Sequence, residues 1–284
     1  SAIGFVHSII ITKLGVPSFV MTLAASLIWS GVLLYLTTEF TDAGTIRIQD
    51  GTLIDLANNF LSDLAGWILG AAVVVGYAAA QLANTRTRRL RGLEAKPMVI
   101  VLAQIVVVGG LTLAGVAIAN ADRGVPQVTL TLGVFLAFWT FIASKTAFGR
   151  HVYAVGGNPE ATRRAGINVD GVRIIVFMIN GFMAGVGGII LVSRLRSVAT
   201  NTGGGNLLLN IIAAAVIGGT SLFGGQGRVV SALYGALVIT AIQNGMDLLG
   251  LSSGAKFIIT GIVLLLAVLI DSVSKRRRTA RGLA

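Results

Sequence analysis

The polar side chains that could do chemistry inside the apolar segments of this chain are mostly uncharged. Five of them carry amide or hydroxyl groups: Asn180, Thr220, Ser221, Gln243 and Asn244. Such groups can exchange hydrogen bonds with a polar solute without burying a charge. Each could instead hydrogen-bond a neighbouring helix, because such bonds commonly join helices in membranes. Since ion-coupled carriers usually carry charged residues at membrane depth, the pattern favours a neutral solute and an external energy source.

A second group of chemically suggestive residues lies in the polar segment 149–171, which has the signals of a short helix. Asn158 can cap a helix whose first residue is Pro159. Glu160 then falls in the first turn, where the helix dipole favours a carboxylate. The preceding pair Gly156-Gly157 would present this helix flexibly.

The end of the same helix is also marked. Arg163 and Arg164 fall in its last turn, where the helix dipole favours cations. Gly166 suits the left-handed residue that closes a helix. The sequence therefore predicts a helix over 159–165, and an ordinary connecting loop is the alternative.

Several kinds of site are missing from this sequence. It has no GxxxxGK[ST] phosphate loop, no HExxH motif and no cysteine, and its two histidines, His7 and His151, are far apart. We therefore expect no catalytic residue, no metal site and no cofactor in this chain.

Composition defines the elements that must position these residues. The chain has 55% hydrophobic and only 12% charged residues, with a mean hydropathy of +0.86, whereas soluble domains have about 25% charged residues. A helix of about 20 apolar residues crosses a bilayer. An all-α polytopic bundle of about eight spans is predicted. The segments are Val16–Thr38, Ala65–Ala83, Met98–Asn120, Val128–Thr146, Val172–Ser193, Leu207–Leu222, Val229–Leu249 and Lys256–Asp271.

Basic residues predict the sidedness of the bundle. Of the 22 Lys and Arg, 17 fall in or beside the segments 84–97, 149–171 and 223–228, the C-terminal tail and Lys13, whereas seven of the 11 acidic residues fall on the other side. The basic side is expected to be cytoplasmic. This distribution explains the net charge of +11 through topology and lipid contact, without nucleic acid.

Two further segments have patterns with more than one interpretation. Leu53, Leu56, Ala57, Phe60, Leu61 and Leu64 recur at helical spacing, which predicts an amphipathic outer helix that caps the bundle or docks an external partner. Gly181, Gly185, Gly187 and Gly188 predict a close-packed helix face. The pairs Gly218-Gly219 and Gly224-Gly225 indicate either a broken helix near a transport path or a tight turn at a helix end.

Three motifs resemble one known family. The loop GRHVYAVGGNPEATRRAGI from Gly149 is similar to the GR-x-[IV]-YA-[IV]-GGN-x-EA pattern of ribose- and xylose-type permeases of ATP-binding-cassette importers, with Thr162 in place of the usual alanine. The stretch IAAAVIGGTSLFGG from Ile212 resembles the IAA-x-[VI]-IGGTS motif, although Leu208 and Asn210 stand where acidic residues are frequent. The stretch KLGVPSF from Lys13 resembles the family's entry into an early span. The layout around the loop 86–96 and the triplet Gly245-Met246-Asp247 are closest to xylose-type members.

This resemblance implies a permease that carries a monosaccharide while partner ATPase subunits bind and hydrolyse ATP. It implies a homodimer in the bacterial inner membrane that receives sugar from an extracytoplasmic binding protein. The residues that would contact the ATPase are Gly156, Gly157, Asn158, Pro159, Glu160, Ala161, Arg163, Arg164 and Gly166. Replacing Glu160 or Gly157 is expected to uncouple ATP hydrolysis from uptake. Trp29 and Trp139 could stack on a sugar or lie at the membrane interface.

Residues 1–284 are interpreted as one transmembrane permease domain, with 149–171 as a coupling loop and with earlier spans preceding Ser1. An ion-coupled secondary transporter of a small neutral solute is the alternative function. A membrane scaffold that transports nothing is a third.

Overall fold

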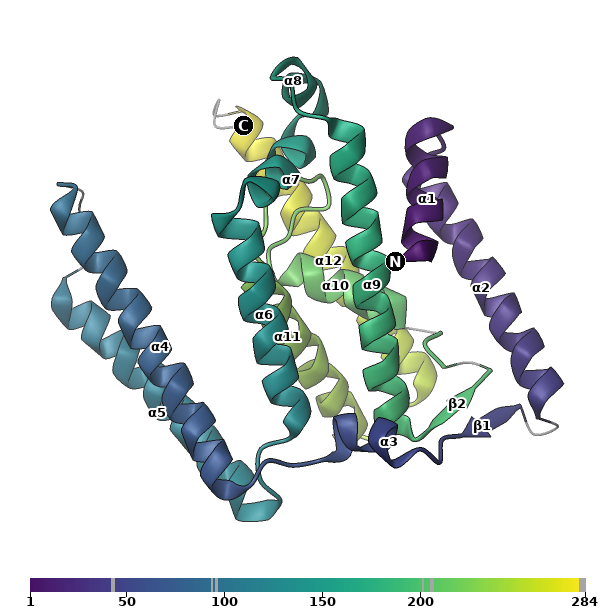
Figure 1. Ribbon diagram of the computed structural model, residues 1–284, viewed down its shortest axis with the longest axis horizontal. Coiled ribbons are helices and arrows are strands. Elements are labelled where there is room, and N and C mark those ends of the chain that lie inside the picture. Colours follow the sequence, from purple (N-terminus) through teal and green to yellow (C-terminus); the bar gives the residue numbers. More distant parts are fainter. Residues whose placement is uncertain (42–43, 93, 95–96, 201, 205–206, 281–284) are drawn as a thin grey trace. The chain divides into compact units, whose positions relative to one another are not determined.

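The computed structural model describes residues 1–41, 44–92, 94, 97–200, 202–204 and 207–280, with side chains described to residue 273. It is an almost wholly helical chain (Figure 1). The helices are α1 (Ala2–Lys13), α2 (Ser18–Phe40), α3 (Gly51–Asn58), α4 (Asp63–Leu90), α5 (Met98–Asp122), α6 (Gln127–Lys145), α7 (Ala147–Gly157), α8 (Pro159–Arg164), α9 (Val169–Leu195), α10 (Leu207–Ile217), α11 (Val229–Leu248) and α12 (Ser253–Ala280). Two short strands, β1 (Thr45–Arg47) and β2 (Ser197–Ala199), pair antiparallel.

Contacts divide the chain into two compact units. Unit 1 comprises Ser1–Ile48 and Val134–Ala284, and unit 2 comprises Gln49–Gly133. Within unit 1, α8 and the C-terminal end of α12 lie at the end opposite β1 and β2 (Figure 1). Within unit 1, the charged segment 149–171 and the end of α12 thus lie together, as predicted for the basic side. The basic loop 84–97 belongs to unit 2, and its residues 93, 95 and 96 lie outside the described residues.

Seven helices of the described part are long and apolar enough to cross a membrane: α2, α4, α5, α6, α9, α11 and α12. Large hydrophobic side chains on these helices are exposed within the chain, for example Leu27 and Val99 at 75% and 77%. In water such a surface would aggregate, whereas lipid solvates it. The polytopic all-α class is therefore confirmed.

The expected crossing helix Leu207–Leu222 is wrong as a single span. Helix α10 has only 11 residues, which is about 16 Å of helix. It stops at Ile217 because Gly219, at a φ of +95°, reverses the chain. The Gly219 and Thr220 amides then donate to the Val216 and Ala215 carbonyls at 2.8 and 2.9 Å, which is the hydrogen-bond pattern of a Schellman motif.

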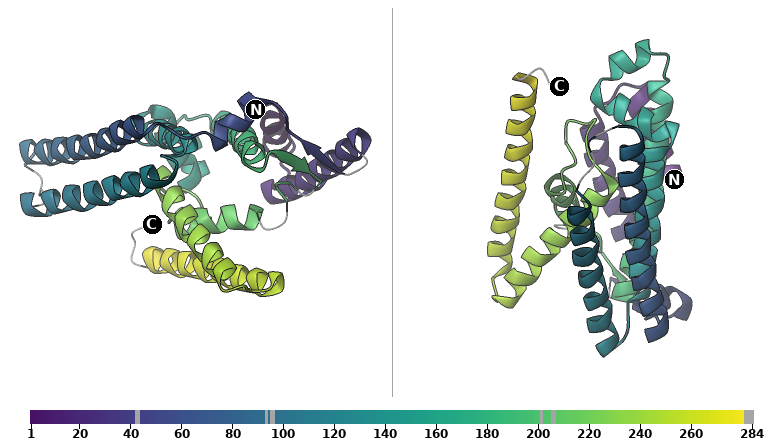
Figure 2. Two further views of the ribbon diagram at one scale, coloured as in Figure 1. Left: turned by 90° about the horizontal axis from the view of Figure 1, so that it is seen from below. Right: turned by 90° about the vertical axis from the view of Figure 1, so that its left-hand side faces the viewer.

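Helices α4 and α5 form the body of unit 2 and lie side by side (Figure 2). Their axes approach closely at glycines: a Cβ on Gly70 would lie 3.0 Å from Val116, and one on Gly109 would lie 3.2 Å from Val74. Small residues at such crossings are the usual packing device between membrane helices.

The predicted amphipathic outer helix is shorter than expected. Helix α3 ends at Asn58, so Phe60, Leu61 and Leu64 do not belong to it. The Leu61 amide donates to the Val125 carbonyl at 2.8 Å, and the Gln127 amide donates to the Asn59 carbonyl at 2.9 Å. The extended backbone after Asn58 is thus paired with residues 125–127, a long-range contact that helical periodicity cannot reveal.

Asp50 caps helix α3 and makes its start sensitive to pH. Its carboxylate accepts from Thr52 Oγ1 and from the Leu53 and Thr52 amides, and these bonds hold the pKa of Asp50 below its ordinary value. A depressed folded-state pKa stabilises the helix above the unfolded pKa, near 4, and the contribution is lost as pH falls through the folded value. We expect hydrogen exchange, corrected for intrinsic rates, to show α3 opening in acid.

The Asp50→Asn variant is the matched control, because asparagine is an equally good cap but has no charge to titrate. We expect the protection of α3 in this variant to be independent of pH below 5. If the wild-type protein and this variant show the same acid response, Asp50 is not the titrating group.

In unit 1, helix α1 packs on the first half of α9 through glycines. A Cβ on Gly4 would lie only 2.2 Å from the Phe177 carbonyl oxygen, and one on Gly181 would lie 3.2 Å from Gly4 Cα. Gly181 is therefore close-packed as predicted. A Cβ on Gly185, Gly187 or Gly188 would meet nothing within 4 Å among the described residues. The predicted continuous glycine face is thus limited to Gly181 within this chain.

Helices α10, α11 and α12 share a small apolar core. It consists of Ala213, Ala214 and Ile239, with Ile217, Val263 and Leu264 packed against it. Small alanines on α10 leave room for α11 to approach to backbone contact. This packing fixes the direction of the loop 218–228, which leaves the end of α10 and enters α11.

Candidate functional site

The start of helix α8 is fixed by the asparagine that the sequence pointed to. Asn158 Oδ1 accepts the Ala161 amide at 3.0 Å, and Pro159 occupies the first turn. Thr162 Oγ1 donates back to the Asn158 carbonyl at 2.8 Å. The predicted short helix is therefore present, and it begins where its cap requires.

Gly166 ends the helix in the manner expected. Its φ is +80°. The Gly166 amide donates to the Arg163 carbonyl at 3.0 Å, and the Ile167 amide donates to the Thr162 carbonyl at 3.3 Å. Two carbonyls of the last turn are thus satisfied by a Schellman motif, which a side chain at position 166 would strain.

One face of α8 is buried and the other is open. Thr162 is only 5% exposed, beside a core formed by Val155, Val169 and Val172 with Val152 and Ile167 packed against it. On the open face, Arg163 Nη1 lies 3.4 Å from Glu160 Oε1, with side chains 56% and 73% exposed. An ion pair this exposed adds little stability to the fold. Because both side chains are exposed, their charges are accessible to another molecule.

The glycine pair before α8 is not the flexible presenter that the sequence predicted. Gly156 and Gly157 form the last turn of α7, a helix that the sequence did not reveal within the loop. A Cβ on Gly156 would lie 2.6 Å from the Gly225 amide nitrogen. These glycines therefore allow close backbone contact with the segment 224–225.

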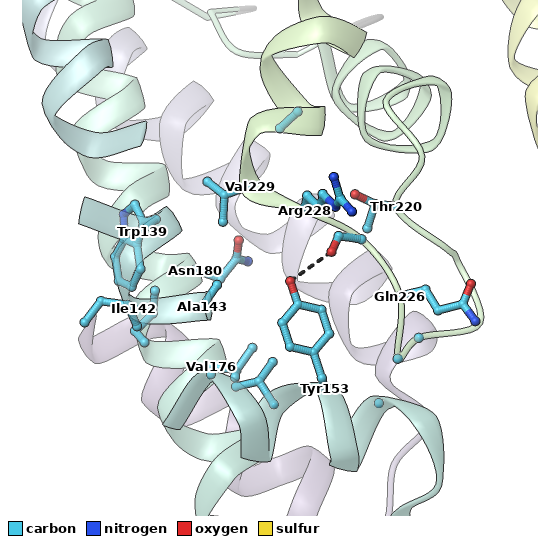
Figure 3. A pocket seen from close by; sticks show the side chains of 18 of the residues that line it. Trp139, Ile142, Ala143, Tyr153, Val176, Asn180, Thr220, Gln226, Arg228 and Val229 are labelled. Carbon is cyan, nitrogen blue, oxygen red and sulfur yellow. Dashed lines mark hydrogen bonds between the residues drawn. The ribbon is translucent and has the colours of Figure 1, made fainter. Parts of the chain in front are cut away.

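A cavity of about 590 Å³ opens beside this contact (Figure 3). Its volume is within the range of small-molecule sites. It is lined by α6, α7, α9, the loop 218–228 and the start of α11. The residues that the argument uses are Trp139, Tyr153, Asn180, Thr220, Ser221 and Gln226.

The predicted pathway residues divide into two groups. Asn180, Thr220 and Ser221 line the cavity, although they come from segments 40 residues apart. Gln243 and Asn244 lie further along α11 and are not among the lining residues. Trp139 lines the cavity and Trp29 does not. A transport role for any of them remains a prediction.

Two aromatic side chains shape the cavity wall. Trp139 Nε1 donates to Met183 Sδ at 3.2 Å, and its ring meets Phe138 edge to face. Tyr153 Oη donates to the Gly227 carbonyl at 2.9 Å (Figure 3). In the sequence, Tyr153 stood out only as part of the motif that begins at Gly149. Its hydrogen-bond partner is 74 residues away, so no local sequence pattern could reveal this contact.

The loop 218–228 is also anchored to α12, on the side away from α7. Asp271 Oδ2 accepts the Leu222 amide at 3.2 Å and Ser221 Oγ at 3.4 Å. Within the loop, the Ser221 amide donates to the Gln226 carbonyl at 3.1 Å. The loop is therefore a compact turn held between α7 and α12.

Asn180 offers a direct test of the cavity as a solute path. We expect Asn180→Ala to reduce solute transport by about fivefold to tenfold, because a hydrogen bond to a neutral partner contributes about 1 kcal/mol or slightly more. Asn244→Ala is the matched control, since Asn244 lies on a membrane helix outside the cavity. Initial rates in vesicles at equal protein content are the measurement, and equal rates for the two variants would contradict the assignment.

The fold and the cavity define a polytopic helical membrane protein with a cavity of small-molecule size beside α7, which leads into the capped, charged helix α8. Residues 1–268 match a family described as the branched-chain amino acid transport system / permease component. The chain belongs to this family of transport permeases. No solved structure matches it.

Three curated relatives are permeases named for a sugar. The chain is 37% identical to the xylose transport system permease protein XylH of Haemophilus influenzae over 262 residues, which cover 92% of this chain and 68% of that protein. It is 38% identical to XylH of Escherichia coli K12, covering 92% of this chain and 65% of that protein. The ribose import permease protein RbsC of Escherichia coli K12 is 49% identical over 150 residues, which cover 52% of this chain and 46% of that protein. The chain thus spans about two thirds of the length of the xylose permeases.

Proposed function

We propose that this chain is the membrane-spanning permease subunit of an ATP-binding-cassette importer that translocates a monosaccharide, xylose or a related sugar. The observation that carries the proposal is the match to xylose permeases over 92% of the chain. The resemblance in the GGN-x-EA loop and the IGGTS stretch is part of that match, and these two segments meet beside the cavity.

The lining of the cavity favours a neutral sugar over an amino acid. Asn180, Thr220, Ser221 and Gln226 supply amide and hydroxyl groups, which pair with sugar hydroxyls. Arg228 also lines the cavity, but no carboxylate is among the described residues that line it. An amino acid would bring an ammonium group into this cavity without an acidic partner, and burying an unpaired charge is costly.

The features of helix α8 support the proposal that a separate subunit hydrolyses ATP. The chain has no phosphate-binding loop of its own, so ATP would be bound and hydrolysed by partner subunits. Glu160, Arg163 and Arg164 lie exposed on α8, whose other face carries the buried Thr162. A helix that is rigidly mounted and exposes charges is suited to insertion into a groove on an ATPase.

The remaining features of the proposed complex follow from the same family. The permease would work as a homodimer in the bacterial inner membrane, with the end that carries α8 in the cytoplasm. An extracytoplasmic sugar-binding protein would deliver the sugar at the opposite end, where β1 and β2 lie.

Uptake of labelled xylose into proteoliposomes tests this function. The permease is reconstituted with its ATPase subunits and binding protein, and we expect uptake that requires ATP, together with ATP hydrolysis that the sugar-loaded binding protein stimulates. Uptake that continues without ATP and collapses with an ionophore would instead show an ion-coupled secondary transporter. Absence of both uptake and stimulated hydrolysis for xylose, ribose and related sugars would overturn the sugar assignment.

A further inference from the structure

The last turn of α7 and the loop before α11 meet through backbone atoms alone. A Cβ on Gly224 would lie 2.5 Å from the Gly156 carbonyl oxygen, and one on Gly225 would lie 2.7 Å from Gly157 Cα. Gly224 and Gly225 also have φ values of +86° and +73°, which disfavour any side chain there. We call this contact of Gly156, Gly157, Gly224 and Gly225 the glycine clasp.

The clasp is reinforced on both sides. Tyr153 Oη, one turn earlier on α7, donates to the Gly227 carbonyl at 2.9 Å. On the far side of the loop, the Asp271 carboxylate of α12 accepts the Leu222 amide at 3.2 Å. The loop is thus attached to α7 by the clasp and Tyr153, and to α12 by Asp271.

Both partners of the clasp also belong to functional surfaces. Helix α7 continues through Asn158 into α8, and the core of Val155, Val169 and Val172 holds α7 on α9. The loop contributes Thr220, Ser221 and Gln226 to the cavity lining. The charged surface helix is therefore connected, through α7, to the loop that lines the cavity by the glycine clasp and the Tyr153 hydrogen bond.

We propose that the glycine clasp transmits movement of α8 to the loop 218–228 and so changes access to the cavity. A contact between flexible side chains can absorb a displacement of about an ångström by changing rotamers, whereas closely packed atoms with no side chain between them transmit it. In this role Gly156 and Tyr153 are positioning residues. The proposal rests on the proposed function, because the force on α8 would come from the ATPase subunits.

The experiment measures cavity access with a single cysteine. The chain has no native cysteine, and Ala232, an exposed residue on α11, lines the cavity. The Ala232→Cys variant is assembled with its ATPase subunits in proteoliposomes. The rate of labelling by a water-soluble maleimide is compared without nucleotide and after trapping with ATP and vanadate.

Three variants are made in this background. In Gly156→Ala the added methyl group would overlap the Gly225 nitrogen at 2.6 Å, whereas in Gly157→Ala it would meet nothing within 4 Å. Tyr153→Phe removes only the hydroxyl that bonds Gly227. Coupling free energies correspond to factors of about 5 to 150, so we expect trapping to change the labelling rate at least about fivefold in the parent protein. We expect that response to be lost in Gly156→Ala, reduced in Tyr153→Phe and kept in Gly157→Ala.

The outcomes separate this inference from the proposed function. If trapping does not alter labelling in the parent protein, ATP-driven gating itself fails, and the inference fails with it. If the parent responds and Gly156→Ala responds equally, the clasp does not transmit movement. If Gly156→Ala and Gly157→Ala both lose the response, Tyr153→Phe decides between the two explanations. A reduced response in Tyr153→Phe supports the clasp. A full response shows that the last turn of α7 acts through another contact, and this result overturns the proposal.

Discussion

Replacing Gly235 with alanine should prevent α11 from packing on α10. A Cβ at this position would lie 1.7 Å from the Ala214 carbonyl oxygen and 3.0 Å from the Gly218 nitrogen. No rotamer change relieves an overlap with backbone, so the two helices must separate. Overpacking typically costs about 1–3 kcal/mol, and we expect the upper end of that range. The measurement is thermal unfolding in detergent, together with the yield of protein in the membrane.

Gly245→Ala is the matched control, because Gly245 lies on the same helix and its Cβ would meet nothing within 4 Å. We expect this variant to be as stable as the wild-type protein, or slightly more stable, since alanine is favoured over glycine in helices by up to about 1 kcal/mol. A Gly235→Ala protein with unchanged thermal stability would show that α10 and α11 do not cross as closely as described. The same crossing accounts for Gly218, whose Cβ would lie 2.0 Å from the Ser231 carbonyl oxygen.

Neutralising Glu160 should uncouple ATP hydrolysis from sugar uptake. Its side chain is 73% exposed on α8, and among the described residues its ion-pair partner is the exposed Arg163, so Glu160→Gln should fold normally. Hydrogen bonds to a charged group contribute about 1.5–3 kcal/mol. We therefore expect the ratio of uptake to hydrolysis in the reconstituted complex to fall by a factor of about ten or more, with hydrolysis itself retained.

Asp170→Asn distinguishes a specific role of Glu160 from a general loss of negative charge. Asp170 Oδ1 lies 3.9 Å from Arg163 Nη2 and is 41% exposed, but it belongs to the first turn of α9. We expect this variant to transport normally. If Glu160→Gln also couples normally, coupling does not depend on the Glu160 carboxylate. The expected uncoupling by replacement of Gly157 moves to Gly156. A Cβ on Gly156 would lie 2.6 Å from the Gly225 nitrogen, whereas one on Gly157 would meet nothing within 4 Å.

Local signals predicted much of the coupling element. Asn158, Pro159 and Gly166 define the ends of α8 through hydrogen bonds between residues at most five positions apart. One short stretch of sequence therefore contains both the capping residues and the helix that they cap. The crossing helices were equally visible, because lipid imposes length and apolarity on each span separately. Sequence patterns failed where a partner is distant. The pairing of Asn59 with Gln127 ends α3 early, and Gly224 and Gly225 turned out to contact α7.

By itself, the sequence determined that this is a polytopic helical membrane protein with a capped, charged helix in its main basic loop. It also indicated the family, because composition, caps and motifs act within single segments. The tertiary structure decided that α10 is too short to cross, that Asn180 shares a cavity with Thr220 and Ser221 while Gln243 and Asn244 do not, and that Gly156 meets Gly225. The physical reason is that each of these depends on which backbones approach within a few ångströms, and a glycine in the sequence does not show what it contacts.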